Sequence, residues 1–134
     1  MGGEFFQEHK GENMVVSQNL VEECKTKLME AKEDIINRVR EAKGTLVKED
    51  TTGDEGDQTN RILQESEFMA NQERLRKQLF EIESALSRID DGTYGLCEET
   101  DEPIEEARLK AIPWTRLSIE GAEIRESQQR KYAR

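Results

Sequence analysis

The sequence Asp91-Gly-Thr-Tyr-Gly-Leu-Cys97-Glu-Glu-Thr100 is followed, after seventeen further residues, by Ser118-Ile-Glu-Gly121. This is the layout of a zinc ribbon, in which C-x-x-C knuckles would occupy positions 97/100 and 118/121. A tetrahedral structural site needs four cysteine or histidine ligands, and only Cys97 is one. A single thiolate with neutral hydroxyls cannot supply the roughly 10 kcal/mol or more that a structural zinc contributes. The sequence therefore predicts a degenerate finger that binds no metal.

Without zinc, such a finger must be held together by side-chain packing. Asp101-Glu102-Pro103 predicts the start of a helix that ends before Pro113, and a last helix is expected from about Ser118 toward Tyr132. We expect the core of the finger to consist of the apolar residues between the knuckles, namely Leu96, Cys97, Ile104, Leu109, Trp114, Leu117 and Ile119.

Upstream of the finger, two segments show helical periodicity. From about Ser17 to Val47, apolar residues recur every three or four positions, at Leu20, Cys24, Leu28, Ala31, Ile35, Val39, Ala42 and Leu46. A second helix is expected from about Gln58 to Ile89, with a seam formed by Phe68, Leu75, Leu79, Ile82, Leu86 and Ile89. Ser17 or Asn19 could cap the first helix, and Gly92 suits the left-handed end of the second. Two such helices predict an antiparallel hairpin, although a self-associating coiled coil would use the same seam.

The predicted architecture is all-α and has four parts. Residues 1–14 form a mobile tail, and 15–90 form the coiled-coil hairpin with an acidic tip at 49–59. Residues 91–122 form the degenerate four-cysteine-type finger, and 118–134 form a C-terminal helix. The two cysteines lie far apart in unlike contexts, so we expect free thiols, with Cys24 serving as a small buried hydrophobe.

Composition narrows the function. With 34% hydrophobic and 37% charged residues, the chain is too lean for one compact globule of its length. A net charge of −10 and the lack of a basic footprint favour a protein partner over direct, sequence-specific nucleic-acid binding. No apolar run could span a membrane and no signal peptide is present, so we expect a cytoplasmic protein, as a monomer. No nucleophile–base pair or phosphate loop is found, which predicts neither an enzyme nor a cofactor.

The segment from Lys48 to Asp57 contains two glycines, five acidic residues and no apolar residue, which predicts a turn between the two helices. Two interpretations of this turn stay open. It is either an ordinary polar connection in which an aspartate caps the next helix, or a tip at which the acidic residues act on a partner.

The residues around the knuckles closely resemble the finger of the bacterial DksA/TraR family, transcription regulators that bind RNA polymerase. The likeness lies in Gly-Thr-Tyr-Gly-Leu-Cys97-Glu-Glu-Thr, Glu-Pro-Ile, Ala-Arg108-Leu-Lys-Ala and Leu-Ser118-Ile. It implies that the hairpin enters the secondary channel of the polymerase and places its acidic tip near the catalytic centre. The family's tip reads Asp-x-x-Asp-x-Ala. Asp54 and Asp57 match this pattern, while Thr59 replaces the alanine.

The resemblance also implies a role in the stringent response, because the family binds the alarmone ppGpp through basic residues at its interface with polymerase. Three of these positions carry residues that are not basic here, namely Glu81, Ile112 and Ala122. Basic residues remain at neighbouring positions, namely Arg74, Lys77 and Arg108. We therefore expect weak or absent ppGpp dependence. The alternative function is a coiled-coil adaptor or homo-oligomeric interaction protein of the same fold that no longer acts on RNA polymerase.

Overall fold

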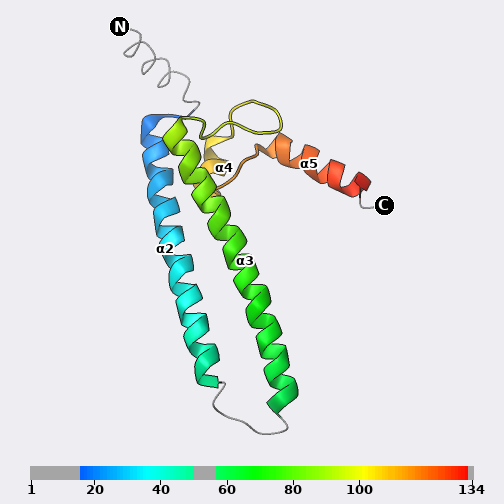
Figure 1. Cartoon of the computed structure of the whole chain (residues 1–134). Helices are drawn as coiled ribbons and strands as arrows, with labels where there is room; N and C mark the ends of the chain where they lie inside the picture. Colours follow the sequence, from blue (N-terminus) through cyan, green and yellow to red (C-terminus); the bar gives the residue numbers. More distant parts are fainter. Residues whose placement is uncertain (1–15, 50–56, 133–134) are drawn as a thin grey trace. The chain divides into compact units, whose positions relative to one another are not determined.

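The computed structural model describes residues 16–49 and 57–132, and within them the chain is helical (Figure 1). Its helices are α2 (Gln18–Glu49), α3 (Asp57–Asp91), α4 (Glu106–Ala111) and α5 (Ile119–Tyr132). Over these ranges the only β pairing is an isolated bridge between Leu96 and Pro103. The predicted all-α class is confirmed. The predicted tail and most of the predicted tip, including Asp54 and the side chain of Asp57, lie outside the described residues.

The ends of the long helices carry the signals that the sequence predicts. Ser17 is the N-cap of α2, because its Oγ accepts a hydrogen bond from the backbone N–H of Leu20 at 3.2 Å. Gly92 follows α3 with a φ of 81°, and the next N–H, that of Thr93, donates to the carbonyl of Arg88 at 2.9 Å. With this left-handed ending, α3 ends two residues later than predicted.

The chain divides into two compact units. The first contains Met1–Met29 and Glu81–Arg134, and the second contains Glu30–Phe80. In the first unit, the described start of α2 and the end of α3 pack with the finger around side chains that are almost completely buried, namely Cys24, Leu28, Ile82, Ala85, Cys97 and Leu109. The Sγ of Cys24 lies 3.6 Å from the carbonyl oxygen of Leu109. The prediction that Cys24 is a buried hydrophobe is confirmed, and both cysteines are free.

In the second unit, α2 and α3 run side by side in opposite directions (Figure 1). Ile35 and Leu75 are buried at their interface, whereas Val39, Phe68 and Leu79 are only half-buried. The predicted seam is therefore present but loosely covered. Gln72 occupies a seam position as well, since it follows Phe68 by four residues and precedes Leu75 by three.

The predicted helix start at Pro103 is wrong. Pro103 pairs with Leu96 in the β bridge, and α4 begins only at Glu106. The N–H of Cys97 donates to the carbonyl of Glu102 at 2.8 Å, and the N–H of Ile104 donates to that of Gly95, also at 2.8 Å. The backbone before α4 therefore forms a tight turn between two short paired segments. Proline is tolerated at the edge of such a pairing, although it has no N–H to donate.

Candidate functional site

The four predicted ligand positions of the degenerate finger come together in the first unit. The hydroxyl of Ser118 donates to the Sγ of Cys97 at 3.4 Å. Gly121 packs directly on the same sulfur, since a Cβ at this position would lie 2.5 Å from it. Thr100 is also near enough to Cys97 to help lower the pKa of its thiol. The spacing of two knuckles therefore survives as a hydrogen-bonded cluster around one buried sulfur.

Ser118 takes over a structural role in helix α5. Its Oγ accepts a hydrogen bond from the N–H of Gly121 at 3.0 Å, which makes it the N-cap of the helix. The carboxylate of Glu105 accepts a second N–H, that of Ile119, at 3.1 Å. A carboxylate at this end is favoured by the helix dipole as well. The second knuckle has thus become the start of a helix that is held by capping.

The cluster does not fit a zinc ion. Structural zinc holds its sulfur ligands at about 2.3 Å and needs four soft or imidazole donors around it. Here one thiol faces two hydroxyls and a glycine, and the backbone of Gly121 fills the space beside the sulfur. In the described parts of the chain, no group of three or more histidine, cysteine or acidic side chains is placed to hold a metal ion.

The same contacts tune the acidity of Cys97. Burial raises the pKa of the thiol, but hydrogen bonds from the side chains and backbone of Ser118 and Thr100 stabilise the thiolate and outweigh it, so that the pKa falls from 9.0 to about 7. The cluster therefore favours a negative charge at the position where the family's layout would hold a metal-bound thiolate.

This lowered pKa predicts that stability rises with pH between about 7 and 9. In that window the unfolded state still holds the thiol proton that the folded state has released, so the free energy of unfolding increases, by about 1–3 kcal/mol in total. Below pH 7 the contribution is lost. Urea unfolding of the reduced protein at several pH values measures the effect. Cys97→Ala, which keeps Cys24, should show a flatter profile; an equal rise in this variant would contradict the assignment.

The packing of the finger differs in part from the prediction. Cys97, Ile104 and Leu109 are buried as expected and Leu117 is half-buried, but three other members of the expected core are exposed. These are Leu96, Trp114 and Ile119, with 37%, 37% and 50% of their surface accessible.

Tyr94 and Val16 fill the core of the finger in their place. Tyr94 is 2% exposed, its hydroxyl donates to the carbonyl of Pro113 at 2.7 Å, and burial raises its pKa. The side chain of Val16 packs against the backbone of Gly95, whose φ of 91° and lack of a Cβ permit the approach. Sequence reasoning missed Tyr94, although its place between two glycines in the first knuckle was a signal that the ring turns inward.

A network of arginines ties the finger to α3. Arg116 donates to Glu81 at 2.7 Å, to Ser84 at 2.8 Å and to Glu98 at 3.1 Å. Arg88 also donates to the Ser84 hydroxyl, at 3.0 Å, and its pKa is lowered by burial and by the charge of Arg116. The sequence analysis noted Glu81 only because it occupies a position at which the family has a basic residue. The structure shows that Glu81 is the main carboxylate partner of Arg116.

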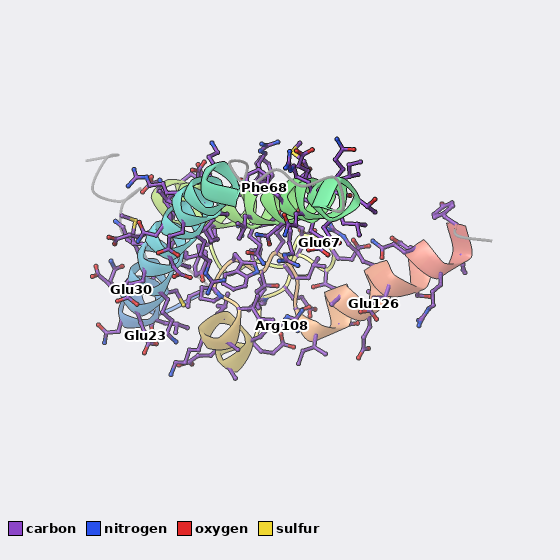
Figure 2. All side chains as sticks on the ribbon, turned by 90° about the horizontal axis from the view of Figure 1, so that it is seen from below. Glu23, Glu30, Glu67, Phe68, Arg108 and Glu126 are labelled. Carbon is purple, nitrogen blue, oxygen red and sulfur yellow. The ribbon has the colours of Figure 1, made fainter. Side chains whose placement is uncertain are left out.

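The three basic positions that the sequence singled out are divided between the units. Arg108 points from α4 toward the segment that leads into α5 (Figure 2), and its Nε donates to the carbonyl of Leu117 at 2.8 Å. Arg74 and Lys77 are exposed on α3 in the second unit, where Arg74 donates to the side chain of Asn71. Arg108 is therefore engaged by the backbone of its own finger.

These observations define a class: an all-α protein whose long helices carry a finger with the layout of a four-cysteine module, closed by hydrogen bonds. The family model described as the prokaryotic dksA/traR C4-type zinc finger matches residues 92–127. The RNA polymerase-binding transcription factor DksA of Caulobacter vibrioides is 39% identical over 113 residues, which cover 82% of this chain and 78% of that protein. The structure of transcription factor DksA2 from Pseudomonas aeruginosa matches with a TM-score of 0.78 and 31% identity, covering 84% of this chain and 88% of that one. The chain belongs to the DksA/TraR family.

Proposed function

We propose that this protein is a DksA-like transcription regulator that binds RNA polymerase, and that it does so without zinc. The observation that carries the proposal is the extent of the likeness, since the 39% identity to a DksA named as RNA polymerase-binding extends over 82% of this chain. The structural match to DksA2 at a TM-score of 0.78 supports the same assignment. A regulator of this kind performs no chemistry and acts in the cytoplasm. Among the described helices, none is long and apolar enough to cross a membrane.

In the proposed mechanism, the helical hairpin enters the secondary channel, and the acidic residues of its tip approach the catalytic centre. Asp54 and Asp57 are the residues that would act there, because both match the family's tip pattern. Negative charge at this place would disturb the mobile catalytic elements and change the stability of promoter complexes. Thr59, where the family has alanine, is exposed near the start of α3, so that its hydroxyl and methyl groups are available to modify the fit.

Zinc independence is supported by the geometry of the finger and predicts that metal removal has no effect. The Cys97–Ser118–Gly121 cluster offers one thiol as a ligand, and its hydroxyl is already engaged in hydrogen bonds to the Cys97 sulfur and the Gly121 N–H. We expect the purified protein to contain well below one equivalent of zinc per chain, and its melting temperature to be unchanged by EDTA. Elemental analysis and thermal unfolding measure these properties. One bound equivalent, or a lower melting temperature in chelator, would contradict the proposal.

Weak ppGpp dependence is supported by the pairing of the remaining charges. Glu81 occupies a position at which the family has a basic residue. It forms an ion pair with Arg116 at 2.7 Å that is partly shielded from solvent. The guanidinium of Arg108 is bound to a backbone carbonyl. An anionic ligand would have to compete with these contacts and would meet the carboxylate of Glu81, which repels it.

In vitro transcription from a ribosomal promoter tests the function and the ppGpp prediction together. The protein alone is expected to change transcript yield, and adding ppGpp is expected to leave that change unaltered, after correction for the effect of ppGpp on polymerase alone. A large enhancement by ppGpp would overturn the second expectation. Failure both to bind core polymerase and to change transcription would favour the alternative, an adaptor or homo-oligomeric protein of the same fold.

A further inference from the structure

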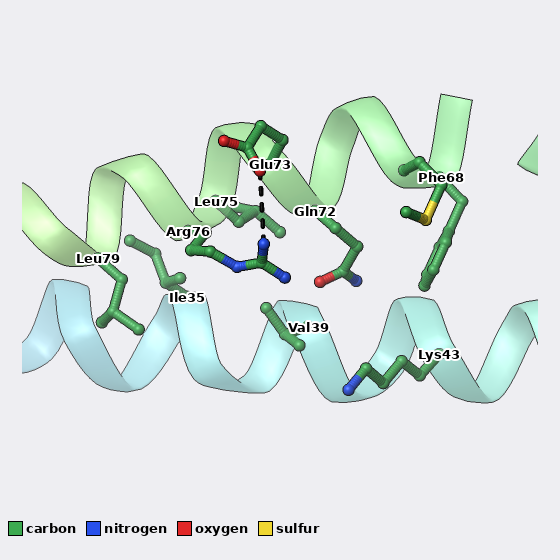
Figure 3. A pocket seen from close by; sticks show the side chains of 10 residues that line it. Ile35, Val39, Lys43, Phe68, Gln72, Glu73, Leu75, Arg76 and Leu79 are labelled. Atoms are coloured by element: carbon green, nitrogen blue, oxygen red, sulfur yellow. Dashed lines mark hydrogen bonds and ion pairs between the residues drawn. The ribbon is translucent and has the colours of Figure 1, made fainter. Parts of the chain in front are cut away.

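The second unit contains a groove between α2 and α3 with a volume of about 350 Å³ (Figure 3). Its apolar lining comes from both helices, and its residues include Ile35, Val39, Phe68, Met69, Leu75 and Leu79. Met69 is 65% exposed, and methionine is a side chain that adapts readily to different partners. The groove thus offers an accessible apolar surface of a size typical of binding sites.

This apolar groove also carries a surplus of hydrogen-bond donors. Gln72 points from α3 toward α2, and its Nε2 is buried with no hydrogen-bond partner among the described residues. Lys43 has no carboxylate at ion-pair distance within the same described part of the chain, and it faces the groove from α2. The second cation, Arg76, forms among the described residues a single ion pair, with Glu73, at 3.5 Å and in an exposed position. Buried donors that lack an acceptor are costly, and two cations attract a negative group.

We propose that this groove binds an amphipathic helix of a partner protein, with an aspartate or glutamate interrupting its apolar stripe. The groove follows α3 from Phe68 to Leu79, which is roughly 16 Å or three helical turns. A third helix laid along two antiparallel helices would insert its apolar side chains between them, as in helical bundles. Its carboxylate would accept the Gln72 N–H and pair with Lys43.

The charge of the groove argues for a partner that differs from a second copy of this chain. In a symmetric dimer the same surface meets itself, so the Lys43 and Arg76 side chains of two copies would be brought together with only Glu73 to offset them. A helix with an acidic side chain would supply the hydrogen-bond acceptor and the negative charge that the groove lacks. This proposal is independent of the tip residues and does not require that polymerase is the partner.

A pair of designed peptides tests the proposal. The first is a helix-stabilised peptide of two heptads with leucines on one face and a single glutamate in its central turn; the second carries lysine in place of the glutamate. Binding is followed by NMR of ¹³C-labelled methionine methyl groups. The glutamate peptide is expected to shift the signal of Met69, while Met29 in the first unit serves as the internal reference. The lysine peptide should bind at least about tenfold more weakly.

Three variants connect the binding to the groove. Lys43→Glu is expected to weaken the glutamate peptide about tenfold and to improve the lysine peptide. Gln72→Leu should weaken the glutamate peptide while the helices remain folded, because it places an apolar residue in the seam. Arg40→Glu, an exposed position of α2 outside the groove, is the matched control and should bind like the wild type. The proposal is overturned if the two peptides bind equally, if Arg40→Glu weakens binding as much as Lys43→Glu, if Met69 does not respond, or if Lys43→Glu abolishes self-association of the free protein.

Discussion

Replacing Gly121 with alanine is expected to destabilise the protein by about 1–3 kcal/mol. In an open helix the same change would stabilise by up to about 1 kcal/mol, because alanine has the higher helix propensity. At this position of α5, however, the new Cβ would lie 2.5 Å from the Sγ of Cys97 and 3.3 Å from the Cβ of Glu99. A fully buried sulfur cannot move away without displacing its neighbours, so the overpacking cost dominates.

A double-mutant cycle identifies the sulfur as the cause. Cys97→Ala removes the atom that Gly121→Ala would strike, so alanine at 121 should cost much less in the Cys97→Ala background and could stabilise there. Gly44→Ala in α2 is the matched control, because nothing lies within 4 Å of its added Cβ; it should stabilise by up to about 1 kcal/mol. Urea unfolding gives all the values. If the destabilisations caused by Gly121→Ala and Cys97→Ala were strictly additive, the contact with the Cys97 sulfur would not be the reason that glycine is needed at position 121.

Much of the fold could be predicted because local signals and the global structure agree. The seam spacing located both long helices, and Ser17 and Gly92 marked two of their ends correctly. The ribbon-like spacing of positions 97/100 and 118/121 predicted a finger in which these residues meet, even though only one of them is a zinc ligand. That Ser118 caps a helix could also have been deduced, since it lies at the start of the predicted last helix and serine is a favoured N-cap residue.

The parts that sequence reasoning missed depend on contacts between distant segments. Whether Leu96, Trp114 or Tyr94 faces inward is set by the turn that pairs Leu96 with Pro103, and no periodicity reports such a turn. The ion pair between Arg116 and Glu81 joins residues 35 apart in sequence. Gln72 went unnoticed because a search for apolar residues at seam positions passes over a polar one.

Asp57→Asn is expected to abolish most of the effect on transcription while binding to RNA polymerase is retained. The substitution preserves size and removes one negative charge, so it separates electrostatic action at the tip from docking of the finger and helices. Loss of a charge interaction worth about 1.4 kcal/mol reduces the effect about tenfold. Asp54→Asn should behave in the same way, since both residues match the family's tip pattern.

Glu55→Gln is the matched control for the tip, because it removes the same charge from the same stretch of sequence at a position that the pattern leaves free. If overall negative charge were sufficient, all three substitutions would reduce transcription effects equally, and the specific roles of Asp54 and Asp57 would be rejected.

Thr59→Ala provides the opposite test. It restores the family's residue at an exposed position that the helix tolerates, and a stronger transcription effect would show that threonine limits the fit of the tip. Binding without any loss of activity in Asp57→Asn would reject the tip mechanism while leaving polymerase binding itself intact.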